Sequence, residues 1–167
     1  MTTHQLLTSH SDRTASSSVK LLTFPMGKLH LALPVDKVKK VQKYVPLHGS
    51  GTSHVNLTHI GDFEVTVVDL HQKLFGVSHD ELCQDGGYFI ITRPIVPDED
   101  YPVQECLGIR VAQSPSLIDV PLEFIRLLPH SYRNADTLRI ASHVAAIESL
   151  EVNSQTIFIL DLQNLIY

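Results

Sequence analysis

Two segments of the chain repeat one short pattern, in which an apolar strand leads into an aspartate and a leucine. The first copy contains Val67-Val68-Asp69-Leu70, and the second contains Ile159-Leu160-Asp161-Leu162. In each copy a turn precedes the strand, and the aspartate is a favoured residue for capping the start of a helix. The repeat therefore predicts two similar structural units. It gives information about the architecture of the chain first, and about its chemistry only afterwards.

The first copy shows the unit most clearly. Gly61-Asp62 marks a turn, and Phe63–Val68 alternates apolar with polar residues, which is typical of a strand with one buried face. Asp69 then caps a short helix, and Gly76 ends it in a left-handed conformation. In the second copy, Asn153-Ser154 takes the place of the turn.

The rest of the chain predicts further short strands. Val19–Phe24 and Leu29–Leu33 form a hairpin, and Pro34 ends it because proline has no amide hydrogen to donate. The segment Asp36–Tyr44 fits either a helix or a strand, and its β-branched residues favour a strand with an irregular start. The other predicted strands are Tyr88–Thr92, Glu105–Ala112, Leu117–Val120 and Phe124–Leu128. The segments Leu138–Ala141 and Ala145–Leu150 precede the second copy of the unit. A chain with many short strands and two copies of one unit predicts two β-barrel lobes.

Length and composition predict a single domain. The chain has 167 residues, of which 43% are hydrophobic, and this is enough for a packed interior. We expect residues 1–18, which are rich in Ser, Thr and His, to form a flexible tail, and residues 19–167 to form the domain. No apolar run approaches the roughly 20 residues of a membrane-spanning helix, and the start of the chain has no signal-peptide core, so we expect a cytoplasmic protein.

The sequence offers no recognisable catalytic, cofactor or metal site. His48, His54 and His59 do not have the spacing of metal ligands, and Cys83 lies between acidic residues, which raise rather than lower a thiol pKa. Asp69 and Asp161 each have a structural role as a helix cap. The net charge of −5 and the scattered basic residues do not indicate nucleic-acid binding. We therefore expect no cofactor and no enzymatic activity, but a protein-binding module.

The order of these segments resembles the CheW-like family, the coupling adaptors of bacterial chemotaxis and twitching-motility arrays. Three pieces carry the resemblance: LLTFPMGKLHLALPVDKVKKVQKYVPL, NLTHIGDFEVTVVDLHQKLFG, and the half of the chain from ECLGIRVA to TIFILDLQNLI. They are similar to the family's opening strands, to its Asn-Leu-Arg-Gly…Pro-Val-Val-Asp-Leu signature, and to its Gly-Leu-x-Val strand and final Leu-Asp-Leu. The resemblance covers about residues 19–166.

Several positions depart from the family pattern. The signature Asn falls on His59, the Arg on Gly61 and the Gly on Asp62. Thr66 replaces the Pro, and the family's Val-Asp becomes Val111-Ala112. The family's Arg is associated with receptor and kinase coupling. Because this chain has Gly61 there, the pattern fits a diverged adaptor that serves a pilus or phototaxis system.

The resemblance implies a mainly β fold of two SH3-like five-stranded β-barrel lobes with short helices. It implies no enzyme activity, and it implies two partners: a CheA-type histidine kinase bound at the barrel ends, and the helical hairpin of a chemoreceptor or pilus-linked sensor bound in the groove between the lobes. The residues that we expect to contact partners are Val38, Val41, Ile60, Gly61, Asp62, Val65, Ile109 and Val111. Self-association through an edge strand such as Tyr88–Thr92 is a further expectation.

Two other functions remain open at this point. One is a regulator that keeps the fold but binds a different protein outside the kinase array, such as an oligomerising cell-differentiation or pilus protein. The absence of the family Arg at Gly61 is the reason to consider it. The other is a β-barrel that binds a small molecule or a metal through its histidines, and stoichiometric metal in the purified protein would be needed to support it.

Overall fold

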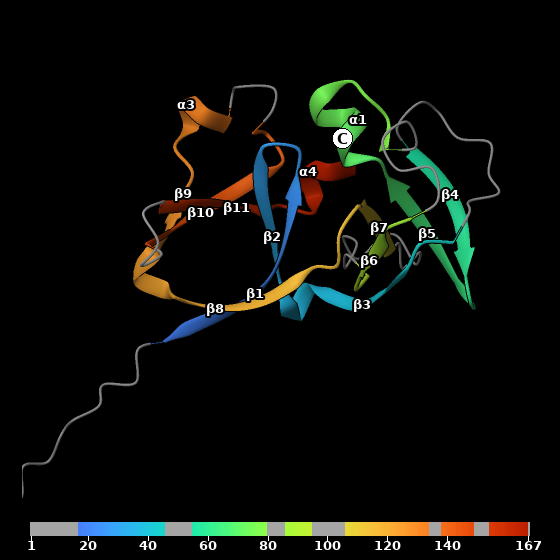
Figure 1. The fold of residues 1–167 in the computed structure, drawn as a ribbon, viewed down its shortest axis with the longest axis horizontal. Helices are drawn as coiled ribbons and strands as arrows, with labels where there is room; N and C mark the ends of the chain where they lie inside the picture. The colour runs from blue at the N-terminus through green and yellow to red at the C-terminus, as the bar shows by residue number, and fades with distance from the viewer. Residues whose placement is uncertain are drawn as a thin grey trace, which may run out of the picture.

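A computed structural model describes residues 17–45, 55–79, 86–94, 106–133, 138–148 and 154–166. Most of the predicted N-terminal tail lies outside these residues, as do His48, His54 and Cys83. The described chain is mainly β and forms two sheets that lie side by side in Figure 1. Its first strand begins at Ser18, one residue before the predicted start of the domain.

The first sheet combines strands from both ends of the chain. Its order is β8-β1-β2-β11-β10-β9, and its only parallel pair is β2 with β11. The strands are β1 (Ser18–Met26), β2 (Leu29–Pro34), β8 (Ser116–Pro121), β9 (Ile125–Leu127), β10 (Ala141–Glu148) and β11 (Ser154–Leu160).

The second sheet is built from the middle of the chain. Its order is β3-β6-β7-β5-β4, and β5 with β7 is its parallel pair. The strands are β3 (Val38–Lys43), β4 (Val55–Ile60), β5 (Phe63–Val68), β6 (Tyr88–Thr92) and β7 (Cys106–Val111).

Short helical segments join the strands. The two 3₁₀ turns, η1 (Val35–Lys37) and η2 (Leu122–Phe124), each follow a proline in an extended conformation. The α-helical segments are α1 (Leu70–Phe75), α3 (His130–Arg133) and α4 (Gln163–Ile166). In Figure 1, α1 and α4 lie next to each other between the two sheets.

The two sheets repeat one arrangement of five strands. In the first sheet, β8, β1, β2, β11 and β10 pair as antiparallel, antiparallel, parallel and antiparallel neighbours. In the second sheet, β3, β6, β7, β5 and β4 pair in the same succession. The predicted fold class, two five-stranded β lobes with short helices, is therefore confirmed. The first sheet carries β9 as a sixth strand, and β9 joins the opposite edge strand β8 through η2.

The repeated Asp-Leu unit occupies equivalent places in the two lobes. Asp69 follows β5 and caps α1 by accepting a hydrogen bond from the Gln72 amide at 3.0 Å. Asp161 follows β11 and accepts from the Gln163 amide at 3.1 Å at the start of α4. As predicted, Gly76 ends α1 with a φ of 74°. A capping side chain satisfies backbone amides that have no partner inside the helix.

One apolar core joins the two lobes. Phe24 and Leu31 from the first sheet pack in the same cluster as Val68 and Ile109 from the second. Each side chain of this size contributes about 1.5–3 kcal/mol when it is fully removed from water. Leu70 of α1 and Leu165 of α4 belong to the same cluster, so these two helices contribute to the apolar interface between the lobes.

The structure decides two local expectations. The segment after Pro34 is a strand with an irregular start, as favoured, because η1 precedes β3. Before the second copy of the repeated unit, one strand, β10, spans Ala141–Glu148. The expectation that Tyr88–Thr92 is an edge strand is wrong. This strand, β6, lies between β3 and β7, and four of its five residues are buried, which is typical of a sheet interior.

Candidate protein-binding surfaces

The eight predicted contact residues all lie in the second sheet or in its β4–β5 turn, but they do not share one surface. Val65, Ile109 and Val111 are each 0% exposed. Val65 packs in an interior cluster of the second lobe with Phe89. Ile109 and Val111 pack in the core between the lobes. These three side chains have no surface to offer a partner in this structure, so their burial stabilises the fold.

The other five predicted residues are accessible and lie at the two edges of the second sheet. Val38 and Val41 are on the edge strand β3, where Val38 is half-buried and Val41 is 39% exposed. Ile60 is half-buried at the end of the opposite edge strand β4, and Gly61 and Asp62 are exposed in the turn that follows it.

Gly61 has a conformational role in this turn. Its φ is 64°, a left-handed conformation that residues with a Cβ rarely adopt, and no other atom lies within 4 Å of where a Cβ would stand. There is therefore room for a Cβ at this position, but the left-handed backbone conformation disfavours residues that have one. A side chain here would be strained by the backbone, whereas its Cβ would meet no neighbouring atom.

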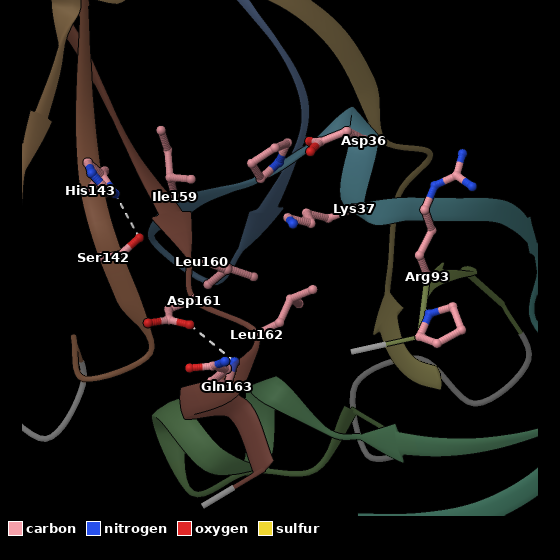
Figure 2. A pocket seen from close by; sticks show the side chains of 12 residues that line it. Asp36, Lys37, Arg93, Ser142, His143, Ile159, Leu160, Asp161, Leu162 and Gln163 are labelled. Carbon is pink, nitrogen blue, oxygen red and sulfur yellow. Dashed lines mark hydrogen bonds between the residues drawn. The ribbon is translucent and has the colours of Figure 1, made fainter. Parts of the chain in front are cut away.

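A pocket with a volume of about 770 Å³ lies between the lobes, and its lining contains none of the eight predicted contact residues. Residues of the first sheet, of η1, of the segment directly after β6 and of the start of α4 line it, and Figure 2 shows them from close by. The lining residues are Pro34, Asp36, Lys37, Arg93, Pro94, Ser142, His143, Ile159, Leu160, Asp161, Leu162 and Gln163. They come from four distant parts of the chain, so no local motif identifies the pocket.

Backbone contacts fix the wall of the pocket that carries η1. Pro34, with φ −57° and ψ 134°, turns the chain out of β2, and η1 follows directly. The Arg93 amide then donates a hydrogen bond to the Lys37 carbonyl oxygen at 2.8 Å. This bond holds the end of η1 against the end of β6, so two cationic side chains leave neighbouring points of the backbone.

The opposite wall belongs to the first lobe. The Asp161 amide donates to the Ile140 carbonyl oxygen at 2.7 Å, and this holds the start of α4 against β10. The Asp161 carboxylate also accepts from the Asn164 side-chain amide at 3.1 Å. Ser142 Oγ and His143 Nδ1 lie 2.8 Å apart on the same wall. Ile159, Leu160 and Leu162 give the pocket an apolar surface beside these polar groups.

Sequence reasoning also missed four large, apolar and exposed side chains on β8, η2 and β9 of the first lobe. They are Leu117 at 61%, Leu122 at 50%, Phe124 at 43% and Leu127 at 62%. Phe124 also borders a small pocket of about 110 Å³. The repeated proline and acidic residue in Pro34-Val35-Asp36 and Pro121-Leu122-Glu123 is the sequence signal that locates η1 and η2.

A buried polar group lies beside α1. The Asp69 carboxylate accepts hydrogen bonds from the Ser78 hydroxyl and the His79 amide, both at 2.8 Å. The guanidinium of Arg110, which is only 5% exposed, stacks over the Tyr44 ring at 3.7 Å. Burial, and then the positive charge of Arg110, lower the pKa of His79. These contacts join β3, β7 and the segment after α1, and they serve the interior of the second lobe.

Two negative findings apply to the part of the chain that the structure describes. Within it, no three His, Cys, Asp or Glu residues gather as metal ligands would. Within the same residues, no helix has the length and apolar character needed to cross a membrane.

Comparison with known proteins shows a likeness at the level of the fold. No protein-family profile matches the chain, and no curated protein matches it by sequence. Among solved structures, the scaffolding protein CheW from Thermoanaerobacter tengcongensis superposes with a TM-score of 0.66 at 14% sequence identity. The likeness covers 92% of this chain and 90% of that protein. It extends over both lobes, and the chain therefore has the CheW-like fold that its sequence pattern predicts.

Proposed function

We propose that this protein is a non-catalytic, CheW-like adaptor of a chemotaxis-type signalling system. In this role it couples a CheA-type histidine kinase to a chemoreceptor, or to a sensor of type IV pili or phototaxis, in the cytoplasm and without a cofactor. The observation that carries the proposal is the likeness to a CheW scaffolding protein over 92% of the chain. Adaptors of this kind act through surfaces, so the accessible residues are the ones to assign.

The kinase contact is assigned to the ends of the second lobe. Val41 offers apolar surface on the edge strand β3, whose outer backbone groups have no strand neighbour among the described residues. Ile60, Gly61 and Asp62 offer a second contact at the β4–β5 turn. Open strand edges pair readily with other chains, and the exposed Lys40 and Lys43 on β3 restrict which partners do so.

The receptor contact is assigned to the pocket between the lobes. An amphipathic helix can place its apolar face in a groove, and the pocket supplies Ile159, Leu160 and Leu162 for that purpose. Val38 begins β3 directly after η1, so in the sequence it is adjacent to residues that line this pocket.

A binding titration tests the proposal. The full-length protein is titrated with the regulatory domain of the CheA-type kinase encoded nearest to it, and saturable binding with a micromolar or lower Kd is expected. Val41→Asp and Asp62→Lys should each weaken the complex about tenfold, which corresponds to roughly 1.4 kcal/mol. Gln155→Glu, at an exposed site on β11, is the control and should leave it unchanged. Absence of binding by the folded protein would contradict the kinase-coupling role.

A second function is favoured by Gly61. The left-handed turn at this residue leaves the β4–β5 corner without the family's arginine, which is associated with coupling. A CheW-like regulator that binds another protein outside the kinase array fits this difference. Capture of partners on the intact protein, followed by mass spectrometry, separates the two functions. Recovery of a kinase together with a receptor would eliminate this second function.

A further inference from the structure

The apolar interior of the first lobe is accessible from the surface beside η2. Val120, which is 1% exposed, packs with Ala145 and Ile157 inside the lobe, and Ile147 packs against the same cluster. Val120 and Ile147 also line the small pocket of about 110 Å³ that Phe124 borders. This pocket therefore leads from the surface to the apolar interior of the first lobe.

The pocket suits one aliphatic side chain. Among the described residues, its lining is apolar except for one aspartate and consists of Asp119, Val120, Pro121, Phe124 and Ile147. The Asp119 carboxylate lies 3.4 Å from the Lys20 amine, so its charge is already paired. An apolar cavity of about 150 Å³ can hold a benzene molecule, so this smaller pocket has room for a branched aliphatic group. A side chain placed there would also cover Phe124, which is 43% exposed.

The N-terminal segment of the chain enters the fold at the rim of this pocket. The Leu122 amide donates a hydrogen bond to the Ser17 carbonyl oxygen at 2.9 Å. Ser18, the first residue of β1, pairs with Pro121 of β8, which lines the pocket, and β8 runs alongside β1 in Figure 1. Neighbouring strands lie about 4.8 Å apart. Residues 1–16, which lie outside the described part of the chain, are therefore tethered beside the pocket.

The tethered segment carries side chains of the matching kind. Leu6 and Leu7 are adjacent apolar residues in a stretch that otherwise consists mainly of polar residues. Ser17 follows Leu7 by ten positions, and a flexible linker of that length spans roughly 16–19 Å on average. A short tether gives a local concentration of about 1 mM, so a contact with a Kd of about 1 mM forms in half of the molecules.

We propose that the N-terminal segment of this chain binds its own first lobe, with Leu6 or Leu7 in the pocket beside Phe124. The inference goes beyond the adaptor function, because the kinase contact is assigned to the second lobe and the receptor contact to the pocket between the lobes. The tether favours this occupant over a second copy of the chain, which has to be recruited from solution. A partner protein that binds beside η2 then has to displace the segment.

Fluorescence of a single tryptophan tests the proposal in the full-length protein. The chain contains no tryptophan, so Phe124→Trp places a unique probe at the rim of the pocket. In this background, the leucine variant carries Leu6→Asp with Leu7→Asp. The matched control carries Thr8→Asp with Ser9→Asp, which makes the same change in net charge in the same segment. Acrylamide quenching measures how much of the tryptophan is accessible to solvent.

Quenching should be about twofold stronger in the leucine variant than in Phe124→Trp alone, because the loss of a half-formed contact doubles the accessible population. The control should quench like Phe124→Trp. A free peptide of residues 1–16, added to the leucine variant at millimolar concentration, should restore the protection. Dilution of the protein should leave the protection unchanged, because an intramolecular contact does not depend on protein concentration.

Methyl NMR repeats the test with Phe124 intact. Leu6→Asp with Leu7→Asp should shift the methyl signals of Ile147 and leave those of Val41, on β3 of the second lobe, unchanged. Equal quenching in the leucine variant and the control, or Ile147 signals that the leucine substitutions do not move, would overturn the proposal. Protection that is lost on dilution, together with the mass of a dimer, would assign the pocket to a second copy and would also overturn it.

Discussion

Lys73 and Leu165 are 92 residues apart in the chain, yet the Lys73 Nζ donates a hydrogen bond to the Leu165 carbonyl oxygen at 2.8 Å. The same amine lies 3.4 Å from the carbonyl oxygen of Asn164. Lys73 is in the last turn of α1, and both carbonyls belong to α4, so a cation of the second lobe caps the helix that ends the first. Cations stabilise the carboxyl end of a helix because the carbonyl groups there lack partners.

Replacing Lys73 with methionine should therefore weaken the joint between the lobes. The variant keeps most of the apolar stem but removes the ammonium group, and the free energy of unfolding should fall by about 1 kcal/mol. Chemical denaturation measures this change, with Lys28→Met at an exposed turn as the control. Equal stability of the two variants would show that the contact does not hold the lobes together.

A second prediction compares two glycines with similar backbone angles. Gly27 has a φ of 58°, and a Cβ there would stand 2.9 Å from the Phe75 ring, whereas Gly61 has a φ of 64° and open space. Alanine at either position should cost about 1 kcal/mol for the left-handed backbone. Gly27→Ala should cost roughly 1 kcal/mol more, because the ring must move.

The difference between the two glycine variants isolates the contact between the β1–β2 turn and α1. Phe75→Ala removes the ring, and in that background the two alanine substitutions should cost the same in thermal or chemical unfolding. A difference that persists without the ring would assign the extra cost to the turn itself.

The third prediction concerns the two helix caps, which occupy equivalent places but make unequal contacts. Asp69 accepts from Gln72, Ser78 and His79 in a half-buried site, whereas Asp161 accepts from Gln163 and Asn164 near the surface. Asp69→Ala should lower the free energy of unfolding by about 2–4 kcal/mol, and Asp161→Ala by about 1 kcal/mol. Similar losses, measured side by side in urea, would contradict the distinction.

A fourth prediction follows from the buried imidazole of His79. The side chain is 3% exposed, and neither ring nitrogen has a hydrogen-bond partner among the described residues. Burial lowers its pKa, the charges of Arg110 and His71 lower it further, and the nearby Asp69 partly opposes them. The folded protein therefore binds a proton at this site less readily than the unfolded chain does.

Stability should depend on pH accordingly. Above about pH 6.5, the ordinary pKa of histidine, the imidazole is neutral in both states and the effect is absent. As the pH falls below that value, the unfolded chain takes up the proton first, and the free energy of unfolding decreases. His79→Gln should reduce the change of the urea-unfolding midpoint between pH 7 and pH 5. An unchanged slope in His79→Gln would assign the acid sensitivity to other groups.

Local patterns were sufficient to predict most of the strands and both caps. Alternation located β5, an unbroken apolar run located β6, and the Asp-Leu pairs located α1 and α4, because each signal is contained within a few neighbouring residues. The interior position of β6 depends on pairing with β3 and β7, so its own residues did not reveal it.

The candidate site was harder to predict for the same reason. Val65, Ile109 and Val111 have the alternation expected of a half-buried strand. Packing inside the second lobe makes Val65 a core residue, and packing between the lobes does the same for Ile109 and Val111. The pocket combines η1, the end of β6, β10 and β11, and such a meeting of distant segments is set by tertiary structure. Nothing in the local sequence around Lys37 or Arg93 indicates that their backbones are joined.

The parallel pairing of β2 with β11 has a consequence for how the protein is made. The second lobe is assembled from Val38 to Val111, but the first lobe needs β11, which ends at Leu160. During synthesis the β1–β2 hairpin therefore leaves the ribosome long before its parallel neighbour exists. Contacts between distant segments form slowly, so we expect the second lobe to fold first. The β1–β2 hairpin should then pack against the folded second lobe until β11 has been synthesised.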